Sequence, residues 1–216
     1  VFNRFLNRLE VLLFHNNRLV RINENTFENL ISLRVLNIYG NRIQEIDENA
    51  FVRMRKVEKI NLSFNRFDLV HVKTTTDAAA ATNNDEWLEI NANHFRNLAN
   101  LRELNLSYNQ IKSIPNETFA DLYNLVLLDL SNNLIEEIRD GAFKNLVSLV
   151  SLDLKNNLIQ SIDKLTFQSL KSLVKLDLNG NKMKPKYLLN LMKNVTLRQT
   201  SVIDDIIAYD LEISQQ

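Results

Sequence analysis

Three aspartates recur at intervals of 24 residues, at Asp129, Asp153 and Asp177. If this spacing places them on adjacent parallel strands, the residues lie about 4.7–4.9 Å apart. Carboxylates that close repel one another, so we expect at least one of their pKa values to rise. Lys155 and Lys175 fall on the same face and can offset the repulsion. The row therefore predicts a mixed polar surface, with part of a protein interface or a metal site as open alternatives.

Other residues that could do chemistry do not form a known catalytic pattern. The chain has no G-x-x-x-x-G-K-[ST], H-E-x-x-H, G-x-S-x-G or G-x-G-x-x-G motif. Its three histidines are His15, His71 and His94, and we expect them to be exposed to solvent. The alternative is that His71 and His94 approach each other and bind a metal ion. No cysteine is present, which excludes disulfides and cysteine metal ligands. We expect neither an enzyme nor a cofactor.

Charge and hydropathy narrow the class of partner. Lys plus Arg and Asp plus Glu both number 26, so the net charge is zero and no overall field favours nucleic acid. No apolar run reaches the roughly 18 residues that a membrane span needs, and the first residues do not form a signal peptide. The expected partner is a protein.

The same 24-residue step organises most of the chain. An asparagine recurs at Asn17, Asn41, Asn65, Asn109, Asn133, Asn157 and Asn181, and these residues define repeats 1 to 7. Every step is 24 residues except the step of 44 from repeat 3 to repeat 4, which indicates a 20-residue insertion. The full template comprises Leu125, Leu128, Leu130, Asn133, Ile135, Ile138, Phe143 and Leu146. A fixed period of this length is the signature of a solenoid.

One repeat contains a strand, a turn and a return segment. In Leu128-Asp129-Leu130 the leucines face one side and the aspartate faces the other, as in a short strand. The repeat asparagine can cap backbone groups at the turn, and stacked asparagines can form a ladder. The bulkier return segments leave the parallel sheet on the concave side. We expect strands centred on Leu13, Asn37, Asn61, Asn105, Asp129, Asp153 and Asp177.

This template resembles that of leucine-rich-repeat proteins of the typical 24-residue subclass. The resemblance implies an α/β solenoid, a horseshoe with a parallel sheet on its concave face and irregular or short-helical convex return segments. The run Ile114-Pro115-Asn116-Glu117-Thr118-Phe119 and the repeated F-x-x-L-x-x-L resemble Toll-type ectodomains and secreted leucine-rich immune proteins of insects. They imply a non-catalytic, extracellular recognition module of an innate-immune or receptor protein. A structural or adhesion protein and a cytoplasmic scaffold are the alternatives, the latter favoured by the missing cysteines.

The repeats suggest three parts in the chain. Residues 1–8 resemble the tail of an earlier repeat, residues 9–184 form seven repeats, and residues 185–216 form a C-terminal cap without cysteines. A partner-facing or coiled-coil continuation is the alternative for the last part. We expect the chain to be a portion of something longer, and association with itself or another chain through its ends stays open. The insertion, at about residues 71–90, is a polar excursion with Trp87 packed on the flank, or a recognition loop with Trp87 as an anchor.

The candidate protein-binding residues occupy exposed positions of the sheet and the insertion. Leu13 is unexpectedly apolar for such a surface, so missing repeats or a partner cover it, or it reflects ordinary scatter. Tyr39 combines apolar area with a polar tip. The full set is Leu13, His15, Asn37, Tyr39, Lys59, Glu103, Asp129, Asp153, Lys155, Lys175, Asp177 and Trp87.

Four Asn-x-Ser/Thr triplets are candidate N-glycosylation sites, beginning at Asn61, Asn105, Asn116 and Asn194. Asn116 lies in a return segment and Asn194 in the end region, which makes them the better acceptors. Glycans on Asn61 or Asn105 would stand on the concave sheet and would move binding to the flank or the convex side.

Overall fold

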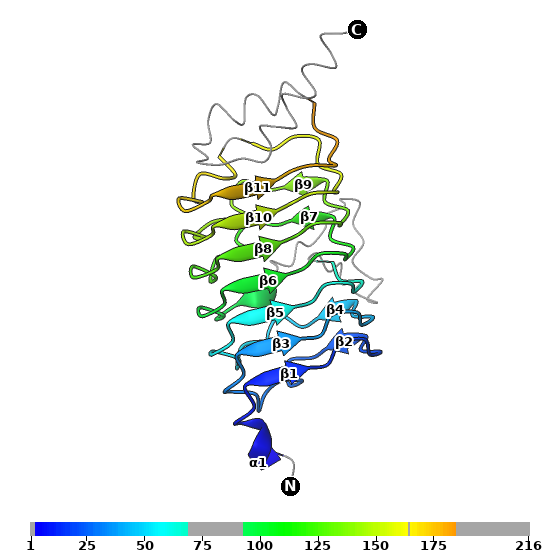
Figure 1. Cartoon of the computed structure of the whole chain (residues 1–216), viewed down its shortest axis with the longest axis vertical. Coiled ribbons are helices and arrows are strands. Elements are labelled where there is room, and N and C mark those ends of the chain that lie inside the picture. The colour runs from blue at the N-terminus through cyan, green and yellow to red at the C-terminus, as the bar shows by residue number, and fades with distance from the viewer. Residues whose placement is uncertain (1–2, 69–92, 164, 185–216) are drawn as a thin grey trace, which may run out of the picture.

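The computed structural model describes residues 3–68, 93–163 and 165–184, which wind into a solenoid whose turns stack along its long axis (Figure 1). Each turn contributes one strand to a parallel sheet, in the order β1-β3-β5-β6-β8-β10-β11. These strands are β1 (Val11–Leu13), β3 (Val35–Asn37), β5 (Lys59–Asn61), β6 (Glu103–Asn105), β8 (Leu127–Asp129), β10 (Ser151–Asp153) and β11 (Lys175–Asp177). The predicted fold class is confirmed.

Little other regular structure accompanies this sheet in the described residues. On the flank, β2 (Arg21–Ile22) pairs with β4 (Glu45–Ile46), and β7 (Ser113–Ile114) pairs with β9 (Glu137–Ile138). The described helices are α1 (Asn3–Leu6) and the 3-10 turn η1 (Asn93–Phe95). The remaining return segments are turns and irregular chain.

The strand positions predicted from the repeat are wrong by one residue. We placed Asp129 at the centre of its strand, whereas β8 ends there and the buried Leu128 is central. The reason is local, because Asp129 Oδ1 accepts the N–H of Ser131 at 3.0 Å and turns the chain. The alternation that sends leucines inward and the aspartate outward is unaffected.

The sheet continues across the 44-residue step between repeats 3 and 4. β5 pairs in parallel with β6, and Lys59 lies opposite Glu103. Phe67 follows repeat 3 as expected, and its N–H donates to Asn109 Oδ1 of repeat 4 at 3.1 Å. The predicted insertion at 71–90, with Trp87, and the predicted cap at 185–216 lie outside the described residues.

Stacked phenylalanines form the centre of the return side. Their ring centroids are 5.9 to 6.3 Å apart and each ring is at most 5% exposed. Full burial of each such side chain stabilises the fold by about 1.5–3 kcal/mol, so the row joins successive turns that could not fold singly. The rings belong to Phe27, Phe51, Phe95, Phe119, Phe143 and Phe167.

The repeat asparagines form the predicted ladder. Asn133 Oδ1 accepts the N–H of Ile111 in the preceding turn at 3.2 Å. Its Nδ2 donates to the carbonyls of Leu106 in that turn and Leu130 in its own, each at 3.0 Å. The ladder therefore satisfies buried backbone groups and fixes the turn that follows each strand.

Candidate recognition face

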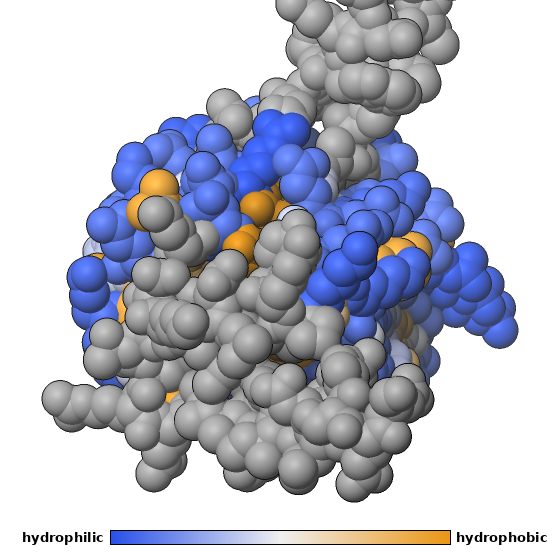
Figure 2. Space-filling model, turned by 90° about the horizontal axis from the view of Figure 1, so that it is seen from above, coloured by the Kyte–Doolittle hydropathy of each residue, from blue (hydrophilic) through white to orange (hydrophobic). Residues whose placement is uncertain are grey.

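The outward side of the seven-stranded sheet is the concave face. In each strand the middle residue points into the core and the first and third residues face solvent. Residues of β3, β5, β6, β8 and β10 line a hollow on this face. Figure 2 looks along the solenoid from the top of Figure 1, and the described residues visible around the rim are mostly hydrophilic. Packing in the core therefore fixes the residue type only at the inward positions. The residues at the outward positions differ from repeat to repeat.

The aspartate row lies where it was predicted, on three adjacent strands. Asp153 pairs in register with Asp129 on one side and Asp177 on the other. Each carboxylate accepts a backbone N–H two residues further on, at 3.0 to 3.1 Å. These hydrogen bonds turn the chain, so each aspartate ends its strand even without a ligand.

The middle carboxylate of this row has the predicted shift. Partial burial raises the pKa of Asp153, and the charges of Asp129 and Asp177 raise it further. The Lys155 N–H and the Lys155 ammonium, 3.5 Å away, act in the opposite direction. Asp153 in turn raises the pKa of Lys155. Among the residues the structure describes, no group of three or more His, Asp or Glu side chains could hold a metal ion.

The first four strands carry a different surface. Lys59 and Glu103, both predicted site residues, form a salt bridge with 2.7 Å between Nζ and Oε1. Leu13 is 60% exposed at the edge strand and Asn37 is half-buried beside it. Lys175 is exposed on β11, at the opposite end of the sheet. On the concave face, β1 and β3 thus carry no charged residue, β5 and β6 carry one paired cation and anion, and β8, β10 and β11 carry the three aspartates and Lys175.

Four rings, which we call the aromatic row, follow the ends of the first four strands. His15 stacks on Tyr39 with 5.2 Å between ring centroids, and Tyr39 meets Phe64 edge-on at 6.5 Å. Phe64 then stacks on Tyr108 at 4.1 Å. His15 and Tyr39 were predicted from the sequence, whereas Phe64 and Tyr108 were not. The missed signal was their place directly before the repeat asparagine, which no other repeat fills with a ring.

The backbone at these two positions is unusual. Phe64 and Tyr108 have φ values of 54° and 55°, in the left-handed region that bulky side chains rarely adopt. The equivalent residues of the other repeats are Asn16, Gly40, Asn132, Asn156 and Gly180, all with positive φ. Such strain costs on the order of 1–3 kcal/mol per residue. The stacking of one aromatic pair returns only about 0.5–1.5 kcal/mol, so stability alone does not account for the two rings.

The candidate glycosylation sites occupy two kinds of position. Asn116 is exposed in a return segment, and its Oδ1 accepts the N–H of Gly141 at 3.3 Å. Asn61 and Asn105 are half-buried on the concave face, where each Oδ1 accepts from the Ser two residues later. Asn194, like Trp87 and His71, lies outside the described residues.

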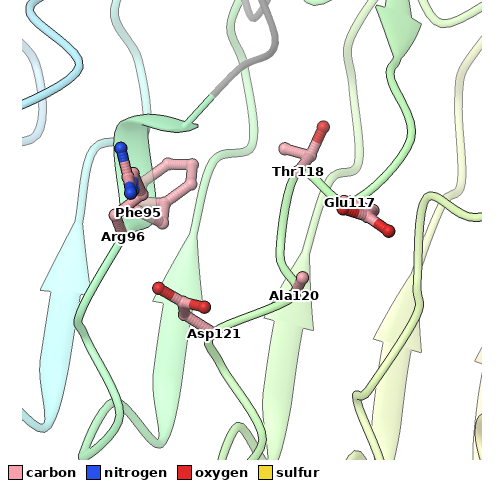
Figure 3. Close-up of a pocket in the computed structure, with 6 residues that line it drawn as sticks. All are labelled: Phe95, Arg96, Glu117, Thr118, Ala120 and Asp121. Atoms are coloured by element: carbon pink, nitrogen blue, oxygen red, sulfur yellow. The ribbon is translucent and has the colours of Figure 1, made fainter.

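Two further features fit structure better than chemistry. The expectation of an exposed histidine is wrong for His94, which is 5% exposed and packs edge-on against Phe67 at 5.4 Å. A hollow of about 190 Å³ lies between the return segments of repeats 3 and 4, beside Phe95, Arg96, Glu117, Thr118, Ala120 and Asp121 (Figure 3). Its carboxylates already bind the Asn97 N–H, at 2.8 Å, and the Lys144 ammonium, at 2.6 Å. The concave face therefore remains the stronger candidate.

Comparisons with known proteins agree with this architecture. No helix in the described residues is long and apolar enough to cross a membrane. A comparison with curated protein sequences gives no match. Among solved structures, the APL1 leucine-rich repeat domain superposes with a TM-score of 0.67 and 23% sequence identity, over 83% of this chain and 41% of that one. The chain thus spans less than half of that neighbour, and the likeness concerns the fold.

The sequence itself also matches a family. The profile described as "Leucine rich repeat" matches residues 7–67, 82–135 and 123–183, which together cover most of the chain. This agrees with the buried leucines, the asparagine ladder and the parallel sheet on the concave face. The chain belongs to the leucine-rich repeat family.

Proposed function

We propose that this chain is a non-catalytic protein-recognition module that binds its partner on the concave face. The observation that carries the proposal is the contrast between the two sides of each strand. The inward side repeats leucine or isoleucine, whereas the outward side offers leucine, asparagine, lysine, glutamate or aspartate in different turns. A rigid stack of short strands presents these side chains as one extended surface, which suits another protein better than a small molecule.

An extracellular role in innate immunity or in a receptor is the more specific part of the proposal. Its support is the resemblance of residues 114–119, and of the F-x-x-L-x-x-L spacing, to Toll-type ectodomains and secreted insect immune proteins. The exposed Asn116, followed by Thr118, adds an acceptor that a secreted chain could carry glycosylated. A structural or adhesion protein, or a cytoplasmic scaffold, would use the same fold.

Recognition on the concave face is tested by selecting binding fragments and mapping where they bind. A display library of protein fragments is panned against the chain, and each enriched fragment is remade pure and titrated. Ser151→Arg places a long cation on β10, where Ser151 lines the hollow of the concave face, and we expect it to weaken binding at least tenfold. Gln168→Arg, on an exposed return segment, should leave the affinity unchanged. Equal affinities for both variants would refute concave recognition.

The extracellular part is tested by modification. The chain is expressed behind a secretory leader in animal cells and its mass is compared before and after N-glycosidase treatment. We expect a glycan that Asn116→Gln removes, while the concave Asn61 and Asn105 remain unmodified. If the secreted, folded chain carries no glycan at Asn116, this residue no longer supports an extracellular role. Glycans on Asn61 or Asn105 would instead argue for recognition away from the sheet.

A further inference from the structure

Two aromatic residues at the concave face have a strained backbone and an exposed side chain. Five of the seven repeats place Asn or Gly at the left-handed position before the repeat asparagine. Phe64 and Tyr108 occupy the same position in repeats 3 and 4 and remain 51% and 46% exposed. A side chain that strains its backbone without being buried points to a function outside the fold.

The surrounding residues make room for these rings. Two residues after their strands, repeats 1 and 2 carry His15 and Tyr39, whereas repeats 3 and 4 carry Ser63 and Ser107. Both serines are small and 4% exposed, so the next residue supplies the ring. The aromatic row therefore continues through four turns, although its members come from two sequence positions.

The arrangement of the rings favours side chains of a protein over the other common ligands of aromatic surfaces. Sugars stack on open ring faces, but Phe64 and Tyr108 turn their faces to each other, with 11° between their planes. His15 and Tyr39 do the same, with 16° between theirs. An anionic lipid surface is disfavoured by the aspartates further along the sheet. The two stacked pairs thus turn one face of each ring away from a sugar, and the exposed remainder of the rings suits apolar side chains.

The charges of the later repeats specify the other half of the ligand. Beyond Tyr108, the ends of β8, β10 and β11 carry the three aspartates, two or three residues before the register of the rings, and Lys155 stands beside the middle one at the position of His15 and Tyr39. Burial and mutual repulsion already work against the charge of Asp153. A basic side chain placed over this row would relieve that repulsion.

We propose that the aromatic row and the aspartate row form one recognition strip for an extended segment of a partner protein. The segment carries apolar side chains over repeats 1–4 and basic side chains over repeats 5–7. Seven strands span roughly 29 Å at their usual spacing, which corresponds to about nine extended residues. The strip comprises His15, Tyr39, Phe64, Tyr108, Asp129, Asp153 and Asp177. This inference rests on the proposed function and narrows it to one border of the face.

The experiment uses a random ten-residue peptide display library, panned against the whole chain. We expect the enriched peptides to have apolar residues at one end and Lys or Arg at the other. One enriched peptide is then synthesised and titrated against three variants. Phe64→Asn/Tyr108→Asn removes both rings, and Asp129→Asn/Asp177→Asn removes two charges but keeps the turn acceptors. Tyr123→Asn, on the exposed return side, is the control.

The strip predicts a distinct result for each variant. The ring variant should lose at least tenfold in affinity while its thermal midpoint stays equal or rises, because Asn relieves the backbone strain. The amide variant should lose at least fivefold, with a weaker dependence on salt, and Tyr123→Asn should change nothing. Enrichment of acidic peptides, an absence of enriched peptides, or unchanged binding by the folded ring variant would overturn the strip. If Ser151→Arg still blocks the fragments selected on the whole face, concave recognition survives that failure.

Discussion

Removal of one rung from the asparagine ladder should cost more than the loss of an ordinary polar side chain. Asn133 is 5% exposed and serves two turns at once. Its Oδ1 accepts the Ile111 N–H at 3.2 Å, and its Nδ2 donates to Leu106 and Leu130, each at 3.0 Å. Asn133→Ala deletes all of these hydrogen bonds. The space it leaves is too small and too apolar for a water molecule that could replace them.

The size of the effect follows from the groups left behind. A buried donor or acceptor without a partner costs about 1–3 kcal/mol, more than the net value of the hydrogen bond itself. With one N–H and three carbonyls affected, the third being that of Ser131, and some relaxation of the turn, we expect Asn133→Ala to lower the free energy of unfolding by about 3–5 kcal/mol. The damage should spread to both neighbouring repeats, because the rung joins them.

The matched control is Asn17, the first asparagine of the series. It is exposed, and its Nδ2 donates to the carbonyls of Phe14 and His15 in its own turn, at 3.3 and 3.0 Å. Asn17→Ala should therefore cost less than about 1 kcal/mol, since water can replace those hydrogen bonds. Urea unfolding followed by circular dichroism measures both variants. Equal losses for Asn133→Ala and Asn17→Ala would refute the assignment of stability to buried, shared rungs.

Three other substitutions test the phenylalanine stack, a left-handed glycine and the aspartate row. Phe119→Ala, in the middle of the phenylalanine stack and fully buried, should lose about 3–5 kcal/mol of stability by urea unfolding, and a loss below 1 would contradict the packing. Gly40→Ala adds a Cβ at a φ of 65° that would clash with Asn16 Oδ1, so it should lower the thermal midpoint, whereas the Cβ of Gly141→Ala has room and should not. Because burial and like charges raise the pKa of Asp153, its ionisation opposes folding, and stability falls as pH rises from 3.8 through the raised pKa. Asp153→Asn should therefore be the more stable form at neutral pH, with an advantage that vanishes below pH 3.8, and a constant difference across the titration would contradict this.

The repeat pattern predicts the fold well because the residues that form the core and the asparagine ladder recur at fixed positions. Leu128, Asn133 and Phe143 each occupy positions where one residue type fits the stacked core, so their spacing in the sequence mirrors their contacts. The strand centres were less predictable. A strand ends where Asp129 takes a backbone N–H, and a period does not show which residue will make that hydrogen bond.

The candidate site was predictable only in part, because exposed positions are free of the constraint that makes a pattern visible. The alignment of Asp129, Asp153 and Asp177 follows from equal spacing and an unbroken register. Phe64 and Tyr108 could not be predicted as site residues, because only their backbone conformation distinguishes them. A ring before the repeat asparagine is ordinary in a sequence and becomes informative once its positive φ is known.

Recognition on the concave face is tested most directly by the structure of this chain bound to the tightest fragment from the display selection. We expect an extended segment along the concave face, with apolar side chains against Tyr39, Phe64 and Tyr108 and a basic side chain over Asp153. A fragment bound to the return segments, with the concave face open to solvent, would contradict it.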